Sequence, residues 1–304
     1  MDAVSSTRLG TLYGAGAYLL WGLFPLYWPL LEPSTALEVL AHRILWSLAV
    51  VVVLLAVTRR LPQLLAVARD PAKAWRLSLA AVVVAVNWGT YIYGVSTERV
   101  VETSLGYFVN PIVTVLLGVL VLGERLRRAQ WVALALAFLA VVVLTVENGR
   151  PPYIALVLAF SFGAYGLLKK TAKVGAVEGL GVETLVLLLP AAAFVTWLAG
   201  TGESTFGTEG PSHAGLLALS GLVTAVPLLL FGGAASRVPL TTLGILQYLA
   251  PTLQFLLGVL LFDEPMPPAK LAGFALVWLA LVLFTSDVVR NHRRSLRLAV
   301  PQPT

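Results

Sequence analysis

The sequence contains no cysteine. This absence excludes disulfide bonds, thiol chemistry and metal sites built on thiolates. Charged residues are also scarce, at 12% of the chain against roughly 25% in soluble proteins. Three histidines are present, and the motifs HExxH, GxSxG and GxxxxGK[ST] are absent. The sequence therefore predicts no enzyme, no metal site and no cofactor, and it excludes an ATP-driven pump on this chain.

Apolar residues make up 58% of the chain, and they fall into ten runs. An α-helix needs about 20 apolar residues to cross a bilayer. The runs lie near 9–31, 35–57, 74–96, 101–122, 129–147, 152–170, 178–199, 213–235, 240–262 and 268–288. We therefore expect an all-α polytopic membrane protein with ten transmembrane helices. The first run is too long for a signal-peptide core of about 7–15 residues, so we expect it to stay as an uncleaved span.

The basic residues predict the orientation of these spans. If each run crosses once, 17 of the 21 lysines and arginines fall on the side that carries both chain ends. Three fall on the other side, and Arg43 lies inside a span. Basic loops face the cytoplasm in most membrane proteins. We therefore expect both termini in the cytoplasm, and a basic tail over 291–304 that contacts lipid headgroups rather than nucleic acid.

Two segments of the chain match at a shift of 140 residues. The segment 111–124, PIVTVLLGVLVLGE, aligns with 251–264, PTLQFLLGVLLFDE. Each half then holds five helices, over residues 1–148 and 149–290. Because five is odd, the second half enters the membrane upside down, which is the inverted repeat of many secondary transporters.

Several short motifs occur in an order that points to a known family. They are HRILWS at 42–47, NW at 87–88, SLGYFVNP at 104–111, LGERL at 122–126 and TLGILQYLAP at 242–251. Together they resemble RarD-type members of the EamA family, in the drug/metabolite transporter superfamily. The resemblance covers about residues 8–290. It implies a carrier of 5+5 inverted helices in the inner membrane that exports a metabolite or drug.

Arg43 stands about eight residues into its apolar run. A charge at this depth costs about 2.5–3.5 kcal/mol on insertion scales, so it needs a partner or a polar cavity. At the shift of 140 residues Arg43 falls on Glu183. We expect the two to face one cavity as an ion pair that substrate or a proton disrupts. The alternative is a permanent pair that fixes helix packing. His42 and Glu183 are the candidates for a coupling proton.

Other polar and aromatic residues occur at similar depth in the spans. We expect these to line the cavity: Trp21, Trp46, Asn87, Trp88, Tyr91, Tyr107, Asn110, Tyr165, Gln247, Tyr248 and Gln254. Ordinary packing is the alternative for each aromatic residue. Pro111 and Pro251 predict breaks in two of the cavity helices, because proline removes a backbone donor. Trp28, near the end of the first run, is expected in the belt of aromatics at the membrane surface.

These features favour a multi-pass secondary carrier for a small molecule, with amino-acid-like or aromatic solutes as candidates. The arginine suits an anionic group, and the aromatic residues suit a ring. A membrane scaffold or sensor without transport is the alternative function. Such a protein has no need of a buried arginine or of an inverted repeat.

Overall fold

The computed structural model describes residues 3–97, 100–148 and 153–261, together with short pieces between 268 and 287. Within these ranges the chain is helical and contains no strand. The elements are α1 (Ala3–Gly22), η1 (Phe24–Leu26), η2 (Trp28–Leu31), α2 (Ala36–Val57), α3 (Leu61–Arg69), α4 (Pro71–Ser96), α5 (Val100–Leu122), α6 (Arg128–Asn148), α7 (Tyr153–Ala172), α8 (Ala176–Thr201), α9 (Pro211–Ala235), α10 (Leu240–Leu246) and α11 (Leu249–Leu260).

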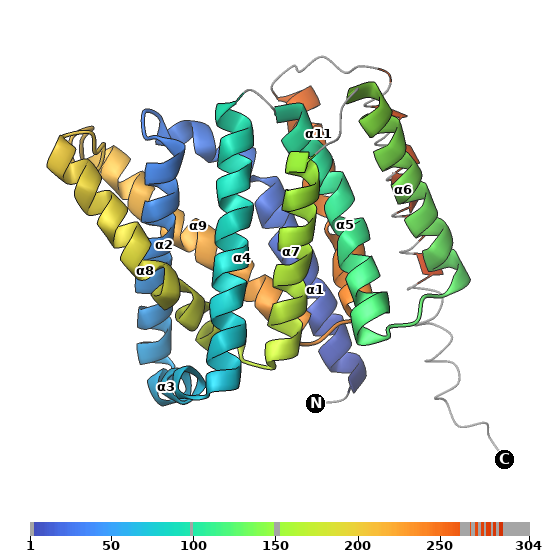
Figure 1. Cartoon of the computed structure of the whole chain (residues 1–304), viewed down its shortest axis with the longest axis horizontal. Coiled ribbons are helices and arrows are strands. Elements are labelled where there is room, and N and C mark those ends of the chain that lie inside the picture. Colours follow the sequence, from blue (N-terminus) through green and yellow to red (C-terminus); the bar gives the residue numbers. More distant parts are fainter. Residues whose placement is uncertain are drawn as a thin grey trace.

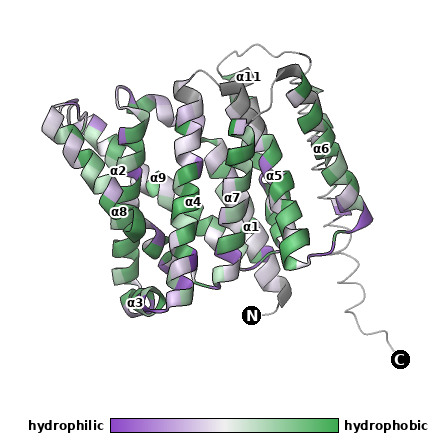
Figure 2. Ribbon diagram, in the orientation of Figure 1, coloured by the Kyte–Doolittle hydropathy of each residue, from purple (hydrophilic) through white to green (hydrophobic). Residues whose placement is uncertain are grey.

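Six of these helices are long and apolar enough to cross a membrane. Their outward surfaces carry large apolar side chains, such as Val53, Trp75 and Leu189, which are 62%, 68% and 78% exposed. Apolar residues cover most of the helix length in Figure 2. Such a surface is stable in lipid and not in water. The chain is therefore a multi-pass membrane protein. The predicted number of ten spans stays a prediction, since most of the run 268–288 and the tail 291–304 lie outside the described residues.

Local sequence signals explain where several helices begin and end. The Thr35 side chain accepts a hydrogen bond from the Glu38 amide at the start of α2. Asp70 caps α4 in the same way, and the side-chain and backbone hydrogen bonds from Lys73 lower the pKa of the Asp70 carboxyl. At the end of α8, Gly202 adopts a left-handed backbone with φ of 77°, which glycine allows without strain. The nine-residue α3 was not predicted from the sequence.

The two predicted helix breaks have different outcomes. Helix α5 runs without interruption through Pro111, so the break predicted there is wrong. The ninth predicted span is broken, at Gln247 and Tyr248 between α10 and α11. Pro251 then lies in the first turn of α11, where a missing backbone donor leaves no hydrogen bond unmade.

The helices form a bundle in which α8 and α9 run obliquely past α2, and α7 lies against α4 and α5 (Figure 1). Helices α2 and α9 approach closely at Gly221, whose carbonyl accepts a hydrogen bond of 3.0 Å from Ser47 Oγ. A Cβ at Gly221 would overlap the backbone of Trp46 and lie 2.7 Å from the amide nitrogen of Ser47. Only glycine fits at this crossing without moving one helix.

The variant Gly221→Ala tests this contact. We expect it to lower the free energy of unfolding by about 2 kcal/mol, since overpacking a well-packed core costs roughly 1–3 kcal/mol. Gly215→Ala on the same helix is the matched control, because a Cβ there meets nothing within 4 Å. Thermal melting of both proteins in detergent measures the difference. Equal melting temperatures for the two variants would contradict the close approach.

Candidate functional site

A cavity of about 190 Å³ lies between the helices. Its walls come from α1, the two 3-10 turns, α2, α4, α5, α7, α9 and the break between α10 and α11. The lining residues are Tyr18, Trp21, Phe24, Pro25, Trp28, Arg43, Asn87, Trp88, Tyr91, Gly106, Tyr107, Asn110, Leu158, Phe162, Thr224, Leu228, Gln247, Ala250, Pro251 and Gln254. The cavity therefore draws on segments from both halves of the chain.

Arg43 supplies the charge of the cavity. Its Nε donates a hydrogen bond of 2.9 Å to Thr224 Oγ1. The guanidinium carbon stands 4.8 Å from the ring centroid of Trp28 and 5.1 Å from that of Trp88. Phe24 lies slightly further away, at 5.9 Å. A cation over an aromatic face is stabilised by about 0.5–2 kcal/mol, so these rings offset part of the cost of removing the charge from water.

Trp28 was predicted to lie in the aromatic belt, and that prediction is wrong because the residue lines the cavity. The reason is that α1 ends at Gly22, earlier than the apolar run suggests. The chain then continues as two 3-10 turns, with Pro25 and Pro29 near their starts. These turns place the ring of Trp28 over Arg43.

The amide side chains of the cavity fall into two groups. Asn87 donates from Nδ2 to the Leu158 carbonyl at 2.9 Å, and Gln254 donates from Nε2 to the Trp21 carbonyl at 3.2 Å. These two amides hold neighbouring helices together. Asn110 and Gln247 are 7% and 5% exposed, and their side-chain oxygens are buried without a hydrogen-bond partner. They remain available to a bound molecule.

The structure brings ten of the residues predicted for the cavity to its walls. They are Trp21, Arg43, Asn87, Trp88, Tyr91, Tyr107, Asn110, Gln247, Pro251 and Gln254. Six further residues that were predicted to face the cavity or to break a cavity helix are not part of its lining. They are His42, Trp46, Pro111, Tyr165, Glu183 and Tyr248.

The residues that miss the cavity do so for simple geometric reasons. Successive residues on a helix point about 100° apart, so His42 turns away when Arg43 faces the cavity. The His42 ring instead stacks on Phe206 at 4.7 Å, and Trp46 lies 6.1 Å from the same ring. Tyr248 donates from its hydroxyl to the Phe108 carbonyl at 3.3 Å.

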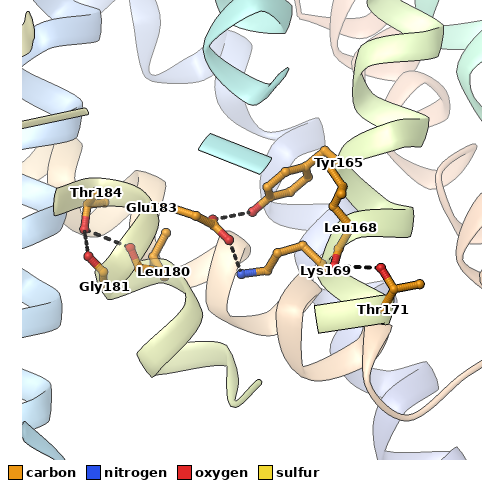
Figure 3. Close-up of polar contacts among 8 residues, drawn as sticks. All are labelled: Tyr165, Leu168, Lys169, Thr171, Leu180, Gly181, Glu183 and Thr184. Atoms are coloured by element: carbon orange, nitrogen blue, oxygen red, sulfur yellow. Dashed lines mark hydrogen bonds and ion pairs between the residues drawn. The ribbon is translucent and has the colours of Figure 1, made fainter. Parts of the chain in front are cut away.

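Glu183 pairs with Lys169, so the predicted ion pair between Arg43 and Glu183 is wrong. Lys169 Nζ lies 2.7 Å from Glu183 Oε1, and the Tyr165 hydroxyl donates to Glu183 Oε2 at 3.1 Å (Figure 3). The side chains of Lys169 and Glu183 are only 5% and 3% exposed. From the sequence, Lys169 was counted among the 17 basic residues on the side that carries both chain ends. Because α7 and α8 are consecutive helices with a short turn between them, the long lysine side chain reaches the carboxylate.

Five aromatic rings form a layer that runs from the cavity wall to this ion pair. The aromatic layer consists of Tyr18, Trp21, Phe162, Tyr165 and Phe231. Trp21 stands 5.7 Å from Phe162 and 5.8 Å from Phe231. Tyr165 stacks on Phe231 at 5.6 Å and also binds Glu183. The layer and the ion pair therefore share a side chain.

Sequence reasoning missed several side chains that shape the cavity, among them Tyr18, Phe162 and Thr224. A signal existed for two of them. Phe162 follows Leu158 by four residues on α7, so both lie on one face of that helix. Thr224 is a polar residue inside the apolar run of α9. No comparable signal distinguished Tyr18 from a packing residue.

The fold is that of a multi-pass helical membrane protein with an internal cavity, and comparisons with known proteins identify its family. A model of the EamA-like transporter family matches residues 8–146. Protein RarD of Streptomyces exfoliatus is 58% identical over 100% of this chain and 97% of its own length. Protein RarD of Escherichia coli is 42% identical, over 97% of this chain and 99% of its own. The chain belongs to the EamA-like transporter family, as a RarD-type protein.

Two further likenesses agree with this assignment. An uncharacterized transporter of Vibrio cholerae is 43% identical over 92% of this chain and 93% of its own length. A solved crystal structure with 21% sequence identity superposes with a TM-score of 0.71, over 92% of this chain and 98% of that one. At this identity the structure establishes the fold alone.

The variant Lys169→Met tests the buried ion pair. We expect it to lower the free energy of unfolding by about 3–5 kcal/mol, because Glu183 is left buried without its counter-charge. Tyr165→Phe removes one hydrogen bond from the same carboxylate, and we expect a smaller loss of roughly 1–2 kcal/mol.

The double variant Lys169→Met with Glu183→Leu removes both charges and should recover most of the stability. Thermal melting in detergent compares the three proteins. A Lys169→Met protein as stable as Tyr165→Phe would show that the ion pair contributes little.

Proposed function

We propose that the chain is a secondary carrier of the inner membrane that moves a small metabolite or amphipathic drug by alternating access. The observation that carries this proposal is the cavity with its single arginine. Arg43 is held by Thr224 and three rings, and it lines the cavity. A protein whose only task is to hold partners together gains nothing from such a charge, which costs free energy in a membrane. Export as the direction of transport rests on the family resemblance.

The position of the aromatic layer favours the interpretation that it is a gate on one side of the cavity. Along α7 the lining residues Leu158 and Phe162 come first, and Tyr165 and Lys169 follow toward the end of the helix. This end of α7 lies at the same end of the bundle as the N-terminus and α3 (Figure 1). The basic residues of the sequence mark that end as cytoplasmic. We therefore assign the aromatic layer and the Lys169–Glu183 pair to a closed cytoplasmic gate.

A carrier that alternates exposes its cavity to each side of the membrane in turn, whereas a scaffold or sensor has no need to. The absence of native cysteine makes this difference measurable without removing any residue. Ala250 lines the cavity at the start of α11 and is small enough to become cysteine. Ala137 is buried in a separate apolar cluster with Phe108 and Ile112, and it provides an unreactive control.

We predict that Ala250→Cys reacts with a membrane-impermeant maleimide from both sides of the membrane. The measurement compares intact spheroplasts with inside-out vesicles. Ala137→Cys should react from neither side. Reaction of Ala250→Cys in only one of the two preparations, even after long incubation, would favour the scaffold or sensor and overturn the carrier.

A further inference from the structure

Among the described residues that line the cavity, Arg43 alone has a full charge. No aspartate, glutamate, lysine or histidine is found among these described lining residues. Three acidic groups described on α2 and α8 are engaged elsewhere, and one of them, Glu178, lies 3.5 Å from Arg60. Glu183 binds Lys169, and Glu38 accepts hydrogen bonds from Ser204 and Thr205. Within the described part of the chain, the positive charge of the cavity therefore has no carboxylate to neutralise it.

The surroundings of Arg43 leave one part of the guanidinium for a ligand. The Nε edge is fixed by Thr224, and the guanidinium carbon lies over the rings of Trp28 and Trp88. The remaining edge carries the two terminal nitrogens. A guanidinium edge of this kind binds a carboxylate through two parallel hydrogen bonds. A ring of the ligand can then stack on the aromatic walls of the same cavity.

Asn110 and Gln247 define a second point of recognition. Both side-chain oxygens are buried without a partner, and both residues line the cavity. A buried acceptor left unpaired costs about 1–3 kcal/mol, which a donor on the ligand recovers. These residues come from α5 and from the break after α10, whereas Arg43 comes from α2. Helices α2 and α5 stand on opposite sides of α4 (Figure 1), so the two points of recognition belong to different walls.

We propose that the solute carried in this cavity is a monocarboxylate with an aromatic ring and a neutral hydrogen-bond donor at the far end of the ring. This proposal rests on the carrier function proposed above. The carboxylate binds Arg43, the ring lies among the tryptophans, and the donor binds Asn110 and Gln247. An α-amino acid fits less well. Its ammonium group is attached next to the carboxylate, beside the guanidinium, where no acidic side chain of the lining compensates it.

Four matched compounds separate the parts of this proposal. The compound 3-(4-hydroxyphenyl)propionate has all three features. Tyrosine adds an α-ammonium group to it, tyramine lacks the carboxylate, and 3-phenylpropionate lacks the hydroxyl donor. Isothermal titration of the full chain in detergent gives the affinity of each. We expect the first compound to bind roughly ten- to hundredfold tighter than tyrosine or tyramine, as expected for a hydrogen-bonded charge pair.

Two variants assign the features to residues. Arg43→Gln should bring the affinities of 3-(4-hydroxyphenyl)propionate and its primary amide to within about twofold of each other. Gln247→Met should instead remove the preference for the hydroxyl compound over 3-phenylpropionate and keep the preference for the acid. Arg237→Gln is the matched control and should change neither ratio. This arginine also lies near a ring, with its guanidinium carbon 5.5 Å from the Tyr13 centroid, but it is outside the cavity.

Several outcomes would overturn the proposed substrate class. They are binding of tyrosine as tight as that of the acid, no binding of the acid up to millimolar concentration, or an acid preference that survives in Arg43→Gln. Thermal melting of each variant confirms that it is folded. The accessibility of Ala250→Cys is independent of any ligand. A protein that alternates but does not prefer the acid therefore refutes the substrate class and leaves the carrier function in place.

Discussion

The charge of Arg43 in a membrane interior is the constraint on which the arrangement of α2 and α9 depends. Arg43 and Ser47 are four residues apart on α2, and Gly221 and Thr224 are three apart on α9. The contacts of Arg43 with Thr224 and of Ser47 with Gly221 therefore lie on consecutive turns where the two helices cross. Because Gly221 has no side chain, α9 comes close enough for Thr224 to reach the guanidinium. The close packing of α2 and α9 at Gly221 and the hydrogen bond from Arg43 to Thr224 therefore depend on each other.

The cavity cation, Arg43, and the buried cation, Lys169, have different surroundings. Lys169 lies against a carboxylate and a tyrosine ring, and its charge is balanced within the protein. Arg43 has rings and one hydroxyl, which orient the charge without cancelling it. A balanced pair favours one fixed arrangement of α7 and α8. An unbalanced charge leaves an electrostatic attraction for an anion, which is what a binding site for a solute requires.

Polar residues inside apolar runs were enough to predict most of the cavity, because a membrane tolerates them only where protein or a cavity satisfies them. Arg43, Asn87 and Gln247 were found in this way. The partner of Glu183 was not predicted correctly. The shift of 140 residues matches positions in the two halves, but it carries no information on which side chains are long enough to reach each other. The position of Trp28 depends on the early end of α1 at Gly22. Gly22, Pro25 and Pro29 were visible signals for that end, but the length of the apolar run concealed them.

Pro111 and Pro251 occupy matching positions in the two similar segments, but the helices around them differ. Sequence similarity between the halves therefore does not imply the same local helix geometry. In α5 the helix continues through Pro111 and presents Tyr107 and Asn110 to the cavity from one continuous face. In the other segment α10 ends before Gln247, whose backbone amide donates to the Leu243 carbonyl at 3.1 Å, and the next amide, of Tyr248, donates to the Ile245 carbonyl at 3.2 Å in a 3-10 type bond. The break turns Gln247 into the cavity, where its side-chain oxygen has no partner. One wall of the cavity is therefore a continuous helix and the other a broken one. In the binding mode proposed above, the solute contacts Gln247 at this break, so the proposed recognition and the interruption of the helix fall at the same place.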